Sequence, residues 1–132
     1  MLLLYKNIRR KLLRMLYEYK FLISLAFTLF VEIIFLFILI KFFFVKDTKR
    51  ISNFLLLFTG FLCSFATLPY LWFIMPFLIR TRIPYILFGE FFVILIESFI
   101  IFFLLRINYK KALIISLICN LASFLLGLIS IF

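Results

Sequence analysis

The chain has 132 residues, 68% of them hydrophobic, and a formal net charge of +10 with no histidine. A soluble domain is nearer half apolar because its surface faces water, so this composition excludes a soluble globular protein and indicates an integral membrane protein. The lack of histidine removes the commonest general base and the commonest metal ligand, and we find no catalytic set of residues. We therefore expect a protein that is not an enzyme and that uses no metal and no cofactor.

Residues 1–20 are predicted to form a basic amphipathic helix that lies on the membrane surface. We expect its cationic side chains to contact anionic lipid headgroups, and these residues are Lys6, Arg9, Arg10, Lys11 and Arg14. Nucleic acid is the alternative partner for this charge, but it is not expected, because the segment leads directly into an apolar span. No small-residue cleavage site follows the segment, so a cleaved signal peptide is not expected either.

Four apolar stretches are each long enough to cross a membrane, because about 20 helical residues cover roughly 30 Å of hydrocarbon. The predicted spans are residues 21–44, 51–68, 84–105 and 112–131, which form a four-helix transmembrane bundle over residues 21–132. Two prolines interrupt the second stretch, which is predicted to continue to residue 79 as a kinked helix end or as an interfacial segment. Polar residues at 46–50 and 106–111 are expected to connect the spans. The predicted fold class is an all-α integral membrane protein with four transmembrane helices behind an interfacial helix.

The two halves of the chain suggest a tandem two-helix repeat. Glu32 can be aligned with Glu97, and Asn53 with Asn120. Two hairpins in the same orientation would be related by an axis along the membrane normal. The separation from glutamate to asparagine is 21 residues in the first half and 23 in the second, so the repeat is a hypothesis.

The orientation in the membrane is weakly determined by charge. Lysine and arginine residues number eight on the side of the N-terminus and seven on the other side, whereas the positive-inside rule needs a larger imbalance. We expect both termini to lie in the cytoplasm, with the cytoplasmic membrane as the location, because the densest basic cluster is N-terminal. The even split also permits insertion in both orientations.

Three glutamates lie inside the predicted spans. Glu32 is in the first span, and Glu90 and Glu97 are in the third. A charged side chain at the bilayer centre costs roughly 2.5–3.5 kcal/mol, so such residues usually have a partner or a function. We expect Glu32, Glu97 and Asn120 to face the interior of the bundle and Glu90 to lie nearer one membrane surface.

Small and polar residues recur at steps of three and four along the spans, which places them on one face of each helix. The first interpretation is helix packing, in which buried hydrogen bonds join the spans. The second is a pathway along which a glutamate changes charge as a proton or solute passes. The candidate residues for both are Glu32, Glu97, Asn120, Glu90, Ser123, Ser116 and Thr28. Cys63 and Cys119 are expected to be free buried thiols, with a redox pair as the alternative.

Two functions are compatible with these observations. The first is an accessory or scaffolding subunit, or a self-associating bundle, that acts through helix contacts with copies of itself or with other membrane subunits. The alternative is a proton- or cation-coupled small transporter or channel that uses the intramembrane glutamates. Polar faces that line a wet cavity would favour transport, whereas polar faces closed against other helices would favour packing.

Overall fold

A computed structural model describes residues 1–44 and 51–131 of the chain. Within these residues every regular element is a helix and no strand occurs. The polar connection predicted at residues 46–50 lies outside the described part.

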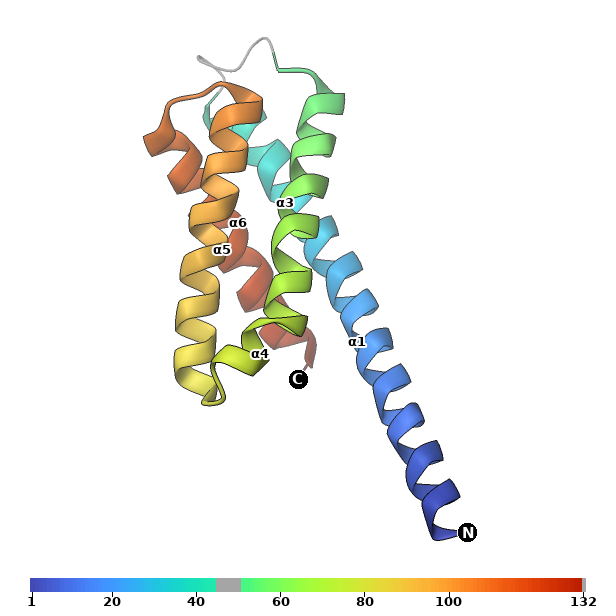
Figure 1. Cartoon of the computed structure of the whole chain (residues 1–132). Coiled ribbons are helices and arrows are strands. Elements are labelled where there is room, and N and C mark those ends of the chain that lie inside the picture. Colours follow the sequence, from blue (N-terminus) through green and yellow to red (C-terminus); the bar gives the residue numbers. More distant parts are fainter. Residues whose placement is uncertain (45–50, 132) are drawn as a thin grey trace.

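The elements follow one another as an N-terminal helix, three further long helices and one short helix (Figure 1). Their bounds are α1 (Leu2–Ile38), a π-helical turn η1 (Leu39–Phe43), α3 (Asn53–Phe73), α4 (Met75–Leu78), α5 (Arg82–Leu105) and α6 (Tyr109–Ile131). By length and hydropathy, four segments can each cross a membrane, namely Leu2–Phe43, Asn53–Leu78, Arg82–Leu105 and Tyr109–Ser130. The prediction of a multi-pass all-α membrane protein is confirmed at this level.

The N-terminal helix joins the predicted basic segment to the predicted first span. α1 runs without a break from the basic segment into the first apolar span. The physical reason is that residues 1–44 contain no proline and no glycine, so nothing interrupts the helical hydrogen bonds near residue 20. Whether residues 1–20 lie along a membrane surface stays a prediction.

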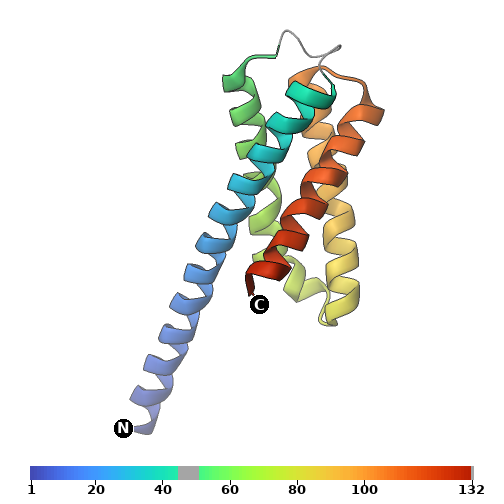
Figure 2. The same ribbon diagram turned by 180° about the vertical axis from the view of Figure 1, so that it is seen from behind.

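The four long helices alternate in direction and form a ring in which α1 packs on α3, α3 on α5, α5 on α6 and α6 on α1. Both termini therefore lie on the same side of the bundle, as Figures 1 and 2 show. The N-terminal part of α1 extends away from the other helices in both views. Every side chain from Met1 to Lys20 is exposed. We call residues 2–16 the N-terminal arm.

The half of the bundle farther from the termini is a closely packed apolar core. Ile40, Leu56, Ala112 and Ile115 have no exposed surface at all. The cluster is made of Leu36, Leu39, Ile40, Leu56, Cys63, Ile101, Leu105, Ile107, Ala112, Ile115 and Cys119. This half of the bundle is therefore mainly apolar.

Two tyrosines complete the C-terminal end of α3, where the helix runs through Pro69 and stops at Phe73. The last carbonyl groups of a helix have no partner inside it, and such groups are costly to leave unbonded in hydrocarbon. The hydroxyl of Tyr17 on α1 donates to the Trp72 carbonyl (2.6 Å), and that of Tyr85 on α5 donates to the Leu71 carbonyl (2.7 Å). The end of α3 is thereby attached to both neighbouring helices.

Gly60 allows α3 to approach α1 closely. A Cβ atom at Gly60 would lie 2.7 Å from Cγ1 of Ile33 on α1, a distance at which one of the two must move. We expect Gly60→Ala to lower the free energy of unfolding by about 1–3 kcal/mol, because overpacking displaces side chains from their rotamers.

Thermal unfolding in detergent, followed by circular dichroism, measures this change in stability. Gly127→Ala is the matched control, because a Cβ atom there would meet no atom within 4 Å among the described residues. Equal stability of the Gly60→Ala variant and the original chain would contradict the prediction.

The hypothesis of a tandem repeat gains no support from the two asparagines. Asn53 is the first residue of α3 and is exposed, whereas Asn120 is buried near the middle of α6. The equivalence of the two hairpins stays a prediction.

Candidate functional site

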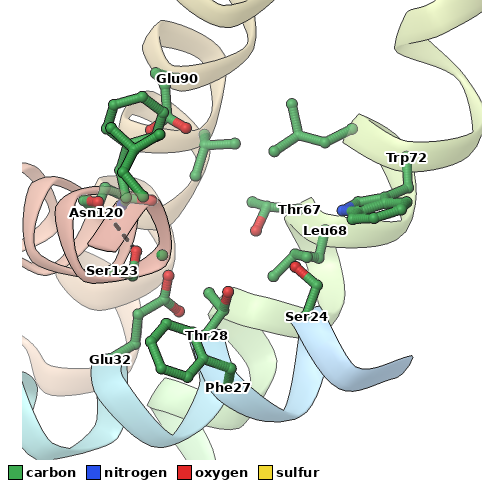
Figure 3. Close-up of a pocket in the computed structure, with 15 residues that line it drawn as sticks. Ser24, Phe27, Thr28, Glu32, Thr67, Leu68, Trp72, Glu90, Asn120 and Ser123 are labelled. Carbon is green, nitrogen blue, oxygen red and sulfur yellow. Dashed lines mark hydrogen bonds between the residues drawn. The ribbon is translucent and has the colours of Figure 1, made fainter. Parts of the chain in front are cut away.

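The half of the bundle nearer the termini encloses a cavity of about 230 Å³, which we call the central cavity. Figure 3 shows its walls, to which all four long helices contribute. The residues that line it are Ser24, Phe27, Thr28, Glu32, Thr67, Leu68, Leu71, Trp72, Glu90, Val93, Asn120, Ser123, Phe124, Gly127 and Leu128. The small and polar residues of α1 and α6 thus face a cavity over much of their length instead of closing against each other.

Glu32 forms part of the cavity wall from α1. Its side chain is only 4% exposed, and its Oε2 atom accepts a hydrogen bond from the hydroxyl of Ser64 on α3. In Figure 3 the carboxylate points toward Ser123 of α6. The Ser123 hydroxyl itself donates to the Asn120 carbonyl at 3.0 Å. One oxygen of Glu32 is therefore fixed by α3 while the group as a whole remains at the cavity surface.

Glu97 lies behind this wall and is 2% exposed. Its Oε2 atom accepts a hydrogen bond from the side-chain amide of Asn120 on α6, whose nitrogen also lies 2.9 Å from the Ser116 carbonyl. On the other side, Oε1 of Glu97 lies 3.1 Å from the hydroxyl of Thr67 on α3. The carboxyl group therefore links three helices, and Thr67 and Asn120 separate it from the central cavity, which they both line.

The Thr67 hydroxyl has one proton but two neighbouring acceptors. Its oxygen lies 2.8 Å from the Cys63 carbonyl and 3.1 Å from Oε1 of Glu97. A hydroxyl donates one hydrogen bond and accepts others, whereas an ionised carboxylate only accepts. When Thr67 donates to Cys63, its bond with Glu97 forms only if Glu97 carries a proton. The geometry thus accommodates the neutral acid with every group bonded.

Glu32 and Glu97 share a second, much smaller cavity. It measures about 10 Å³, and the two glutamates line it together with Leu36, Gly60, Cys63, Ile101 and Cys119. A single water needs roughly 10–15 Å³ of such space. Glu32 lines both cavities, whereas Glu97 lines only the small one. The two cysteines in this wall are free thiols.

Glu90 is placed on α5, within the wall of the central cavity. Its side chain is half-buried and makes no hydrogen bond and no ion pair within residues 1–44 and 51–131. The carboxylate is eight residues along α5 from Arg82, which corresponds to about 12 Å of helix. At this depth of the span, no group of the described residues is therefore bonded to it.

A wider outer pocket of about 580 Å³ adjoins the central cavity. The two spaces share Ser24, Phe27, Trp72 and Gly127, and Lys20 lines only the outer one. Trp72 is held by its ring contacts with Tyr17 and Phe21 of α1, at centroid distances of 5.2 and 5.8 Å. The central cavity thus continues toward the side of the molecule on which both termini lie.

The remaining candidate residues are placed as follows. Thr28 and Ser123 line the central cavity, and the hydroxyl of Ser116 donates to the Ile94 carbonyl of α5 at 2.9 Å. The five basic residues of the N-terminal helix are exposed and lie outside the cavity.

Several residues of the site were not among the candidates, and the most important of them are Ser64, Thr67 and Trp72. Ser64 and Thr67 belong to a polar face of the second span that helical spacing does indicate, but their glutamate partners are 32 and 30 residues away in the chain. Nothing in the sequence pattern connects Trp72 with the cavity.

The charge of the cavity contrasts with that of the chain. Fifteen residues of the chain are lysine or arginine and five are aspartate or glutamate. Among the described residues, however, two glutamates line the central cavity and no lysine or arginine does. The same part of the chain has no group of three His, Cys, Asp or Glu side chains that could hold a metal ion. The arrangement can bind a positive charge or exchange protons.

Comparison of the chain with protein-family models, with curated proteins and with solved structures finds no match.

Proposed function

We propose that this chain is a small membrane carrier for protons or cations, in which Glu32 and Glu97 bind and release protons. The observation that supports the proposal best is the central cavity, which extends from the side of the termini to Glu32 and has hydroxyl, amide and carboxyl groups in its walls. Ionisable residues inside membrane spans that face such a cavity are typical of proton and ion pathways.

The apolar half of the bundle favours a carrier over an open channel. Leu36 and Ile101 line the small cavity shared by Glu32 and Glu97, and both belong to the apolar core of the other half of the bundle. A proton on Glu97 therefore reaches the opposite side only when this packing opens. The proposal places the protein in the cytoplasmic membrane with both termini in the cytoplasm, and it allows an oligomer.

Reconstitution into liposomes tests this function. The full chain is incorporated into vesicles that contain a pH-sensitive dye, and a proton gradient or a membrane potential is applied. We expect proton uptake well above that of protein-free vesicles. Uptake at the protein-free level, with protons and with sodium or potassium gradients alike, would overturn the proposal.

The exposed surface of the N-terminal arm supports a second candidate, an accessory or scaffolding subunit that acts through helix contacts. Leu4, Ile8, Leu12 and Leu16 recur at helical spacing and are 49–66% exposed. These side chains would be covered by anionic lipid, by a second copy or by another membrane subunit. Recovery in mild detergent as a stable complex, without any flux after reconstitution, would favour this function over the carrier.

A further inference from the structure

We infer that the central cavity is a binding site for a small organic ammonium ion, held by Glu32 and Glu90 and by the aromatic side chains of the cavity wall. The inference names the class of solute for the proposed carrier and in that respect rests on it. The site is argued from the charge of the walls, from their aromatic groups and from the space that they enclose.

The first argument is charge. Glu32 on α1 and Glu90 on α5 reach the same cavity from different helices, and no lysine or arginine of the described residues lines it. Glu90 makes no hydrogen bond and no ion pair within that part of the chain. A carboxylate at this depth is costly without a cation. A ligand with one positive charge would therefore act as the counter-ion of the carboxylate.

The second argument is the aromatic lining. Phe27, Trp72 and Phe124, from α1, α3 and α6, line the cavity. An ammonium group near such rings is attracted to their faces. In Figure 3 Trp72 turns the edge that carries its indole N–H toward the cavity, so the ring faces for a cation would be those of Phe27 and Phe124. An ion with an apolar body would contact these rings, whereas a small hydrated metal ion would not.

The third argument is the coordination that the walls can offer. Calcium needs six to eight oxygen ligands and magnesium needs near-octahedral geometry, but the described residues contain no group of three acidic, histidine or cysteine side chains for a metal. The hydroxyls of Ser24, Thr28 and Ser123 are acceptors for ammonium N–H groups. The central cavity alone, at about 230 Å³, is somewhat smaller than the roughly 300–1,000 Å³ of drug-sized sites, which suits a small ion.

Trp72 is the only tryptophan of the chain, so its fluorescence reports directly on this cavity. The purified full chain in lipid nanodiscs is titrated with butylammonium and with tetraethylammonium. Butanol and butyrate serve as the neutral and anionic counterparts, and sodium and potassium as inorganic ions. We expect a saturable change of fluorescence with the ammonium ions only. A similar response to butanol, or saturation by sodium or potassium alone, would overturn the inference.

Glu90→Gln tests the role of charge and should weaken ammonium binding at least tenfold. Glu18→Gln is the matched control, because Glu18 is exposed on α1 outside the cavity, and it should bind as the original chain does. If Glu90→Gln does not fold, Glu90→Asp keeps the charge and should retain binding. Unchanged affinity in a folded Glu90→Gln variant would overturn the inference.

The outcomes distinguish this inference from the proposed function. Saturable ammonium binding without any flux in liposomes would support the binding site and contradict the proposed carrier function. Proton flux without ammonium binding would support the carrier function and contradict organic ammonium ions as its ligands.

Discussion

Replacing Glu97 by glutamine should stop proton flux and leave the bundle folded. A glutamine side chain has the same shape, accepts the hydrogen bond from Asn120 through its oxygen and donates to Thr67 through its nitrogen, so both contacts persist. It cannot take up or release a proton. We expect flux in liposomes to fall to the protein-free level, with a free energy of unfolding within about 1 kcal/mol of the original value.

Two further variants show what the Glu97→Gln result means. Glu97→Leu removes both hydrogen bonds and leaves one N–H of Asn120 without its partner, which should cost about 1–3 kcal/mol of stability. Glu18→Gln changes the same functional group at an exposed position and should leave flux unchanged. Normal flux in the Glu97→Gln variant would exclude proton exchange at this residue. A parallel loss of stability and flux in that variant would assign Glu97 a structural role.

A tryptophan at position 127 should block the central cavity. Gly127 lies in α6 and lines both the central cavity and the outer pocket. A Cβ atom added at this position would have no atom of the described residues within 4 Å. A large side chain fits there without displacing the helix and occupies the space through which the two cavities join. We expect Gly127→Trp to reduce proton flux to the protein-free level while the melting temperature stays close to the original.

The matched control for this block is a tryptophan on the opposite surface of the same helix. Ile129 is 71% exposed and lines neither cavity, so Ile129→Trp should retain flux. Flux in the Gly127→Trp variant equal to that of the Ile129→Trp variant would show that the cavity is not the route.

The class of fold could be predicted because a membrane span can be recognised from consecutive residues of the sequence. Twenty or so apolar residues in succession are sufficient for a transmembrane helix, and the structure has four helices of this kind. The continuity of α1 was harder to predict, because the change from basic to apolar residues near position 20 marks a change of environment and not a change of backbone conformation. The absence of proline and glycine before residue 45 was the better guide.

The polar contacts could be predicted only in part, for a related reason. Helical spacing indicates which face of a span is polar, and the structure buries Glu32, Glu97 and Asn120. Spacing does not indicate which face of another helix lies opposite. The partners of the glutamates, Ser64 and Thr67, depend on how α1, α3 and α5 pack, as does the contact between Tyr17 and Trp72, 55 residues apart.

The length of α1 has a mechanical consequence. With η1 it extends over 42 residues, or about 63 Å at 1.5 Å per residue, which is roughly twice the thickness of the hydrocarbon layer. The N-terminal arm is free of the bundle, and the first tertiary contacts of α1 are those of Tyr17 and Phe21 with Trp72. Trp72 is thus the place at which α1, followed from its N-terminus, first contacts the rest of the bundle. Because residues 1–44 contain no proline or glycine, we expect a displacement of the arm to be transmitted along α1 to the wall that carries Glu32.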